Sequence, residues 1–301
     1  MIGEGNLRDD VNVSLVRPGV DLIDAPRLER AVDASGDARD WLGRPIDCEQ
    51  CSHKELRDDG KCRQGHSCVV DRVIKHIDRF FKAAPQLADS YLEHPYFELR
   101  AVAVKYASLF RVAPMLSDPE PEVRTMAVWR LPSERVKGLA NDPDRRVRIG
   151  VAMKMQGKSL LAMLSDADHH VRALVVRKLA PELLPMAMRD SDPAVRRWVA
   201  RRIVVSRLID MRDDKDPMVR AEVAERLHPA RLAIFAADPD LRVRFIAAER
   251  IDQEFLPLFT SDPDALVRDM AMQRLHACDS RVPDGGLVAL RNTAMADPKA
   301  S

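Results

Sequence analysis

The chain has 301 residues, with 48 Lys and Arg against 47 Asp and Glu, so its formal net charge is +1, and only 5% of its residues are aromatic. This balance excludes a globally basic protein that wraps nucleic acid and a protein dominated by an acidic tail. No run of about 18 uncharged apolar residues is present, so we expect no membrane-spanning helix.

Residues 1–46 are predicted to form a partly irregular N-terminal extension, since acidic residues mix there with short apolar pieces. The segment Met1–Arg17 has no apolar core and does not have the composition of a secretory signal. Residues 1–69 carry a net charge of −4 and the rest of the chain carries +5. Because four of the five cysteines crowd between positions 48 and 68, we expect a reducing, cytoplasmic location and no secreted disulfide scaffold.

Four cysteines lie close together in residues 47–69, which we predict to be a small cluster-binding domain. They follow the spacing C-x2-C-x10-C-x5-C, as Cys48, Cys51, Cys62 and Cys68. Four thiols this close in sequence indicate a metal site more strongly than disulfides, and short spacers allow one loop to close around one centre. Gly60 and Gly65 permit the sharp turns that such a loop needs.

The residues themselves leave the metal open between one Zn²⁺ ion and a [4Fe–4S] cluster, because four sulfurs suit either. His53 and His66 are near, but four thiolates already complete a ligand set. Cys68 directly precedes a predicted helix, whose positive end favours a negatively charged cluster. Nearby cations either offset that charge further or are ordinary solvated side chains: Lys54, Arg57, Lys61, Arg63 and Arg72.

Residues 94–285 contain eight 24-residue repeats, because an apolar residue followed by Arg recurs at that interval. The pairs begin at Leu99, Val123, Val147, Val171, Val195, Val219, Val243 and Val267. Residues 70–93 lack this pair but keep Val73 and Ile77 at helical spacing, so we predict an entry cap repeat there. Residues 286–301 are predicted to be a C-terminal tail.

Each repeat is predicted to contain an α-helix followed by a shorter helical segment. Val123 and Leu131 lie on one helical stripe, and the proline after Leu131 disfavours further helix. The Asp-Pro pair at Asp118 is predicted to supply an N-cap and a proline at the first helical position. Where this pair lies two residues later, at Asp192 and Asp216, the helix is predicted to begin later. The remaining residues suffice for one or two turns, including tight 3₁₀ turns, so the fold class is an all-α solenoid of stacked repeats.

The periodic arginines have two interpretations. They either lie half-buried in the seam between repeats, bonded to Asp or to free carbonyls, or they form a ladder that tracks phosphates. We favour the structural interpretation, because a phosphate ladder faces solvent and usually accompanies stacking aromatics. A second periodic cation lies at the C-terminal end of each helix, where it complements the helix dipole: Arg130, Lys154, Lys178, Arg202, Arg226, Arg250 and Arg274.

Other candidate residues receive structural interpretations. His169 and His170 have two interpretations, as metal ligands or as a solvated pair, and we favour the solvated pair because adjacent histidines point apart on a helix. Cys278 is interpreted as a packing residue. The sequence contains no Gly-rich phosphate loop, no Gly-x-Ser-x-Gly elbow and no His-Glu-x-x-His motif, so we expect no enzymatic activity.

The segments Pro-Ile-Asp-Cys48-Glu-Gln-Cys51 and Cys62-Arg-Gln-Gly-His-Ser-Cys68, followed by Asp-Pro-x-x-x-Val-Arg units, resemble one known family. This family comprises the leucine-rich repeat variant proteins with an N-terminal iron–sulfur domain. The resemblance covers residues from about 40 to 285 and implies that Cys48, Cys51, Cys62 and Cys68 ligate a [4Fe–4S] cluster. It also implies repeats that alternate α-helix with 3₁₀-helix in a right-handed superhelix without β-sheet. Family members often accompany nitrogen-fixation genes, which suggests that setting.

The residues and the resemblance together predict a non-enzymatic iron–sulfur protein whose solenoid is a scaffold for a protein partner. The cluster is structural, electron-carrying or sensing, and the sequence does not choose among these roles. The alternative is a helical-repeat protein that binds or repairs DNA and carries a four-cysteine cluster or zinc. Its support is the positive charge of the repeat region and the arginine ladder.

Overall fold

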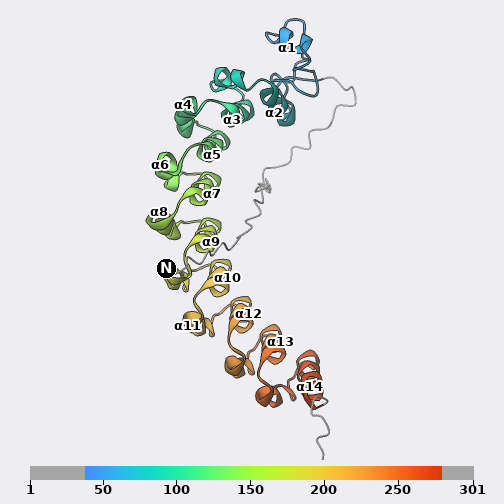
Figure 1. Cartoon of the computed structure of the whole chain (residues 1–301), viewed down its shortest axis with the longest axis vertical. Helices are drawn as coiled ribbons and strands as arrows, with labels where there is room; N and C mark the ends of the chain where they lie inside the picture. Colours follow the sequence, from blue (N-terminus) through green and yellow to red (C-terminus); the bar gives the residue numbers. More distant parts are fainter. Residues whose placement is uncertain (1–37, 280–301) are drawn as a thin grey trace, which may run out of the picture.

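Eight long α-helices form the inner side of a curved rod in the computed structural model, which describes residues 38–279 (Figure 1). The first seven are equal in length, and all eight begin at a constant 24-residue interval. The eight helices are α3 (Phe97–Tyr106), α5 (Pro121–Arg130), α7 (Arg145–Lys154), α9 (His169–Lys178), α10 (Pro193–Arg202), α12 (Pro217–Arg226), α13 (Leu241–Arg250) and α14 (Ala265–Asp279).

Short helical segments form the outer side of the curve (Figure 1). Four of them begin with an α-helical turn: α4 (Leu109–Val112), α6 (Ser133–Val136), α8 (Gly157–Ala162) and α11 (Val205–Leu208). The 3₁₀ segments are Ala113–Ser117, Lys137–Asn141, Met163–Ser165, Pro181–Ala187, Ile209–Met211, Pro229–Phe235 and Gln253–Phe259. No strand occurs within residues 38–279, where β contacts are limited to isolated bridges. The predicted all-α repeat fold is therefore confirmed.

Helix α2 (Ile74–Ala83) and the 3₁₀ segment Pro85–Tyr91 precede the first repeat. Ile77, Phe80 and Phe81 on α2 are fully buried, and α2 packs on α3. This segment therefore covers the apolar face that the first repeat would otherwise expose. Most of the predicted extension at 1–46 and the whole predicted tail at 286–301 lie outside the described residues.

Each unit buries its apolar stripe against its neighbours and not within itself. In the second unit Val123, Ala127 and Val136 are fully buried, and Leu131 is nearly so. Helix α5 packs on α3 before it and on α7 after it. Burying one Val or Leu side chain contributes about 1.5–3 kcal/mol, and every stripe depends on the adjacent unit for that burial.

The long helices begin two residues later than most of the Asp-Pro pairs predict, and in one shared register. Asp142 does not cap α7, because its carboxylate accepts the N–H of Asp144 (2.9 Å) and two bonds from Arg124 of the preceding unit. The side chain of Asp144 caps the helix instead. The predicted N-cap role of the Asp118-type residues is therefore wrong. The predicted later start at Asp192 and Asp216 is also wrong, since both occupy the shared N-cap position.

The periodic arginines join each unit to the next. Nε and Nη2 of Arg124 lie 2.8 Å from the two carboxylate oxygens of Asp142, and Nη1 donates to the carbonyl of Asp118 (2.9 Å). Both side chains of this pair are largely shielded from solvent. The same forked pair recurs as Arg100–Asp118, Arg148–Asp166, Arg172–Asp190, Arg196–Asp214, Arg220–Asp238 and Arg244–Asp262. The structural interpretation of these arginines is confirmed.

The second periodic cation caps the helix of the preceding unit. Arg202 on α10 donates to the carbonyls of Val176 (2.6 Å) and Leu179 (2.9 Å) at the end of α9. Lys178 on α9 reaches the carbonyls of Ala152 and Met155 in the same way. These carbonyls have no partner within their own helix, so the cation satisfies them and complements the negative end of the dipole.

We expect the unfolding free energy to fall steeply when the pH drops below about 4. Burial by itself raises the pKa of Asp262, but hydrogen bonds from Arg244 and from the N–H of Asp264 hold it below its usual value. An Asp side chain in the unfolded chain has a pKa of about 3.9, and a lower pKa in the folded state means that its ionised form stabilises the fold. This stabilisation is complete at a pH above the unfolded pKa and is lost as the pH falls through the folded pKa. Urea midpoints measured from pH 7 to pH 2 test this. Asp262→Asn is expected to be less stable at pH 7 and to show a shallower pH dependence; an unchanged slope contradicts the assignment.

Candidate metal centre

Helix α1 (Lys54–Asp58) and two tight turns build the cysteine-bearing module at one end of the rod (Figure 1). Gly60 and Gly65 have φ of 72° and 67°, a conformation that glycine adopts without strain. Arg63 and Ser67 exchange two backbone hydrogen bonds of 2.8 Å around the turn at Gly65. Cys62 and Cys68 flank this hairpin, and Cys48 and Cys51 precede α1.

The module has a buried side and a more open side. Cys62 and Cys68 are 7% and 2% exposed and belong to the continuous core, whereas Cys48 and Cys51 are half-buried. The Sγ atom of Cys51 accepts the N–H of His53 at 3.5 Å.

The four thiols lie within one another's electrostatic influence. A hydrogen bond from Cys68 lowers the pKa of Cys62, and the same bond together with burial raises the pKa of Cys68. Burial raises the pKa of Cys48, followed by the charges of Cys68 and Cys51. Burial therefore disfavours the thiolate forms of Cys48 and Cys68, and a positive centre beside them offsets this penalty.

Among the predicted counter-charges, Arg57 acts most directly on the thiols, because its charge lowers the pKa of both Cys48 and Cys62. Lys54 binds Glu49 at 2.7 Å, and Lys61 binds Asp59 at 3.2 Å. The expected helix dipole beside Cys68 is wrong, since α2 begins only at Ile74. The intervening residues form a turn around the buried carboxylate of Asp71, which accepts the N–H of Val73 (2.8 Å).

The spacing of the thiols does not by itself choose the metal. The side chains of Cys62 and Cys68 are hydrogen-bonded to each other, and Cys48 and Cys51 are three positions apart in the chain. Four thiols are the donor set of an iron–sulfur cluster and also of a zinc ion.

An open cavity of about 460 Å³ borders the cysteine module. Its lining includes Cys51, His53, Tyr91 and His94. The hydroxyl of Tyr91 is hydrogen-bonded to the ring of His53, and burial followed by the charges of three of the four cysteines raises the pKa of Tyr91 to about 12. Sequence reasoning missed this pair. The available signal was the confinement of all three tyrosines to residues 91–106.

Stacked α-helix and 3₁₀ units that end in a four-thiol module define a helical-repeat protein with a metal-cluster domain. Residues 38–90 match the family model described as "LRV protein FeS4 cluster". A solved structure described as "a leucine-rich repeat variant with a novel repetitive protein structural motif" is 39% identical, with a TM-score of 0.74. The match covers 76% of this chain and 99% of that one. The chain belongs to the leucine-rich repeat variant family, as an iron–sulfur member.

A curated relative from Rhodobacter capsulatus, named "Uncharacterized 27.7 kDa protein in nifB 3'region", is 46% identical over 82 residues. The match covers 27% of this chain and 34% of the relative's length. The family match supports an iron–sulfur cluster and gives no support to the zinc alternative. Within residues 38–279, no helix combines the length and apolarity needed to cross a membrane.

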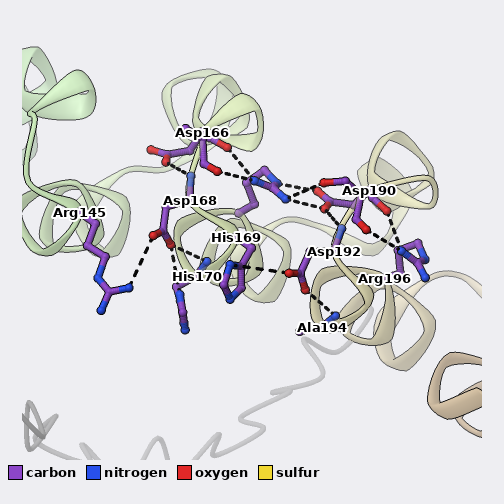
Figure 2. Close-up of polar contacts among 12 residues, drawn as sticks. Arg145, Asp166, Asp168, His169, His170, Asp190, Asp192, Ala194 and Arg196 are labelled. Carbon is purple, nitrogen blue, oxygen red and sulfur yellow. Dashed lines mark hydrogen bonds and ion pairs between the residues drawn. The ribbon is translucent and has the colours of Figure 1, made fainter. Parts of the chain in front are cut away.

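The histidine pair at the start of α9 does not diverge as predicted. The ring centroids of His169 and His170 lie 4.0 Å apart, with 35° between the ring planes. Side chains on a helix lean toward its N-terminus, so rings at the first two positions extend past the helix end and can meet there. Proximity to Asp168 and Asp192 also orients them (Figure 2). The prediction that the two rings point apart is therefore wrong, whereas both side chains do face solvent, as predicted.

Proposed function

We propose that Cys48, Cys51, Cys62 and Cys68 hold a [4Fe–4S] cluster at the end of a non-enzymatic docking protein. The observation that carries this proposal is the convergence of four thiols in a module that is buried on one side and open on the other. Cys62 and Cys68 tie the centre to the core, and Cys48 and Cys51 lie on the more accessible side.

A [4Fe–4S] cluster supplies one-electron chemistry and also crosslinks the loops that ligate it. The cavity beside Cys51 supports a redox-active role, because it brings solvent close to this side of the module. Cys62 and Cys68, by contrast, are buried in the core and shielded from water. The chain thus combines one protected and one accessible side.

The long helices offer the surface for a protein partner. Trp198 lies between Arg177 and Arg201, whose guanidinium carbons are 4.7 and 5.0 Å from its ring. Trp and Arg are the residue types that most often dominate protein interfaces. Helices α9 and α10, which carry these residues, belong to the inner side of the curve (Figure 1). A curved array of this kind forms an extended binding surface.

The alternative of nucleic-acid binding loses its main support. The arginine ladder that suggested phosphate tracking is bonded to aspartates in the seams, with side chains 4–13% exposed. Phosphate contacts require cations that face solvent. The name of the Rhodobacter relative associates that protein with nifB, and we extend this to a nitrogen-fixation setting for the present chain.

Anaerobic affinity purification, followed by an absorption spectrum and by iron, sulfide and zinc analysis, tests the proposal. We expect a coloured protein with about four iron and four sulfide per chain, as the cluster formula requires. We also expect a protein to co-purify with it. A colourless preparation with one zinc per chain overturns the assignment of the cofactor as an iron–sulfur cluster. Co-purifying nucleic acid, with no protein partner, favours the alternative.

A further inference from the structure

Two histidines and two aspartates meet where α9 and α10 begin, far along the rod from the cysteines (Figures 1 and 2). Nδ1 of His170 lies 3.2 Å from Oδ1 of Asp168, and Nδ1 of His169 lies 3.7 Å from Oδ2 of Asp192. Each imidazole therefore faces its own carboxylate. Asp192 thus faces the ring of His169 as carboxylates beside metal sites commonly face the histidine ligands that they orient.

The carboxylates are held in place by the repeat itself. Asp168 accepts the N–H of His170 and Asp192 accepts the N–H of Ala194, each at 2.8 Å, so both are N-caps of their helices. These caps recur with the 24-residue period, and stacking of the units sets them side by side. The oxygen atoms are thus positioned whether or not an ion is bound, which lowers the cost of organising a site.

We infer that Asp168, His169 and His170, with Asp192 beside them, form a binding site for one divalent transition-metal ion. The ligand atoms of the first three residues already lie within 4.8 Å of one another, as in no other such group within residues 38–279. Imidazole and carboxylate together suit ions such as Zn²⁺, Ni²⁺ and Cu²⁺. The side chains of His169 and His170 are 42% and 58% exposed, so an ion reaches them from solvent.

The histidines are a departure from the repeat. The two positions after the N-cap hold other residue types in the seven other units: Phe97-Glu98, Pro121-Glu122, Arg145-Arg146, Pro193-Ala194, Pro217-Met218, Leu241-Arg242 and Ala265-Leu266. The fold therefore does not need histidine there. The repeat fold places an N-cap carboxylate at this seam and at the neighbouring seams. Only the unit that contains α9 places two imidazoles beside that carboxylate.

One cation opposes metal binding at this site. Nη1 of Arg145 lies 3.7 Å from Oδ2 of Asp168, and the positive ends of two helix dipoles also point here. The charges of Asp168 and Asp192 offset these contributions. The Arg145 side chain is 48% exposed and can turn into solvent, so an ion competes with it for Asp168.

Isothermal titration of the cluster-loaded full chain with Ni²⁺ tests the site, because the thiols are then occupied. We expect one Ni²⁺ to bind to the wild type and this binding to be lost in His169→Ala/His170→Ala. Asp192→Asn keeps an N-cap and is expected to weaken binding about tenfold or more. Arg145→Ala is expected to tighten it. His276→Ala, which removes an exposed histidine on α14, is the matched control and is expected to bind as the wild type does.

Equal Ni²⁺ stoichiometry and affinity in the wild type and the double variant overturn the proposal. So does an equal loss in His276→Ala, which indicates binding to surface histidines in general. Circular dichroism of each variant establishes that the helices are intact. All variants keep the four cysteines, so any Ni²⁺ that the thiols bind contributes equally to each, and the comparison between variants reports on the histidine site.

Discussion

Arg196→Ala is expected to destabilise the repeat array by about 3–5 kcal/mol, because it leaves a buried carboxylate without its partner. Arg196 is 3% exposed, and its Nε and Nη2 donate to Asp214 at 2.7 and 2.8 Å. Its Nη1 also donates to the carbonyls of Asp190 (2.9 Å) and Ser191 (3.2 Å). The substitution therefore removes the cation that pairs with the Asp214 carboxylate and the donor to two backbone carbonyls, at the seam between α10 and α12.

The urea midpoint and amide hydrogen exchange measure this effect. In a repeat protein each unit contacts only its neighbours, so we expect faster exchange first in α10 and α12 and later in distant helices. Arg207→Ala is the matched control, since Arg207 binds Asp210 at 2.7 Å with side chains 54% and 41% exposed. An exposed pair contributes about 0–1 kcal/mol. If both variants shift the midpoint equally, the seam arginines are not structural.

Cys51→Ser is expected to remove most of the iron from the purified protein while the repeats stay helical. A serine hydroxyl is a poor substitute for a thiolate ligand, and the three remaining thiols retain their mutual repulsion. The free energy of binding a structural metal centre also stabilises the fold around it. When the centre is lost, we therefore expect rapid exchange of the backbone amide hydrogens in the module around α1. The core residues of α2, beginning with Ile77, are expected to keep their protection.

Iron and sulfide analysis, the absorption spectrum and circular dichroism provide the measurements. Cys278→Ser is the matched control, because it makes the same substitution on α14, outside residues 38–90 that match the cluster family. It is expected to retain the iron of the wild type. Full iron retention in Cys51→Ser removes Cys51 from the ligand set. Loss of the helical signal from the whole array instead means that the module and the repeats fold as one unit.

The cysteine module shows how far sequence reasoning reaches at a site. Short spacing between Cys48 and Cys51, and between Cys62 and Cys68, restricts the separation within each pair, and the glycine turns at Gly60 and Gly65 allow the two pairs to approach. The contact between His53 and Tyr91 joins residues 38 positions apart. Such a contact depends on how α1 docks on the segment before the first repeat, which no local spacing specifies.

The helix starts illustrate a competition that sequence alone does not resolve. Asp142 and Asp144 are both good N-cap residues, and local propensity allows the helix to begin after either. Arg124 of the preceding unit decides the outcome, because it binds the carboxylate of Asp142 and leaves Asp144 to cap α7. The same reasoning applies to His169, whose ring faces Asp192, a carboxylate of the next unit.

The 24-residue period, the all-helical character of the units and the four-thiol module were determined by the amino-acid sequence, because each depends on residues close together in the chain. Three features were decided only by tertiary structure: the register of the helices, the forked arginine pairs and the meeting of two histidines with two aspartates. These features arise at seams, where the partners belong to different units, as Arg124 and Asp142 do. Stacking brings such partners within bonding distance, and burial then makes their pairing obligatory.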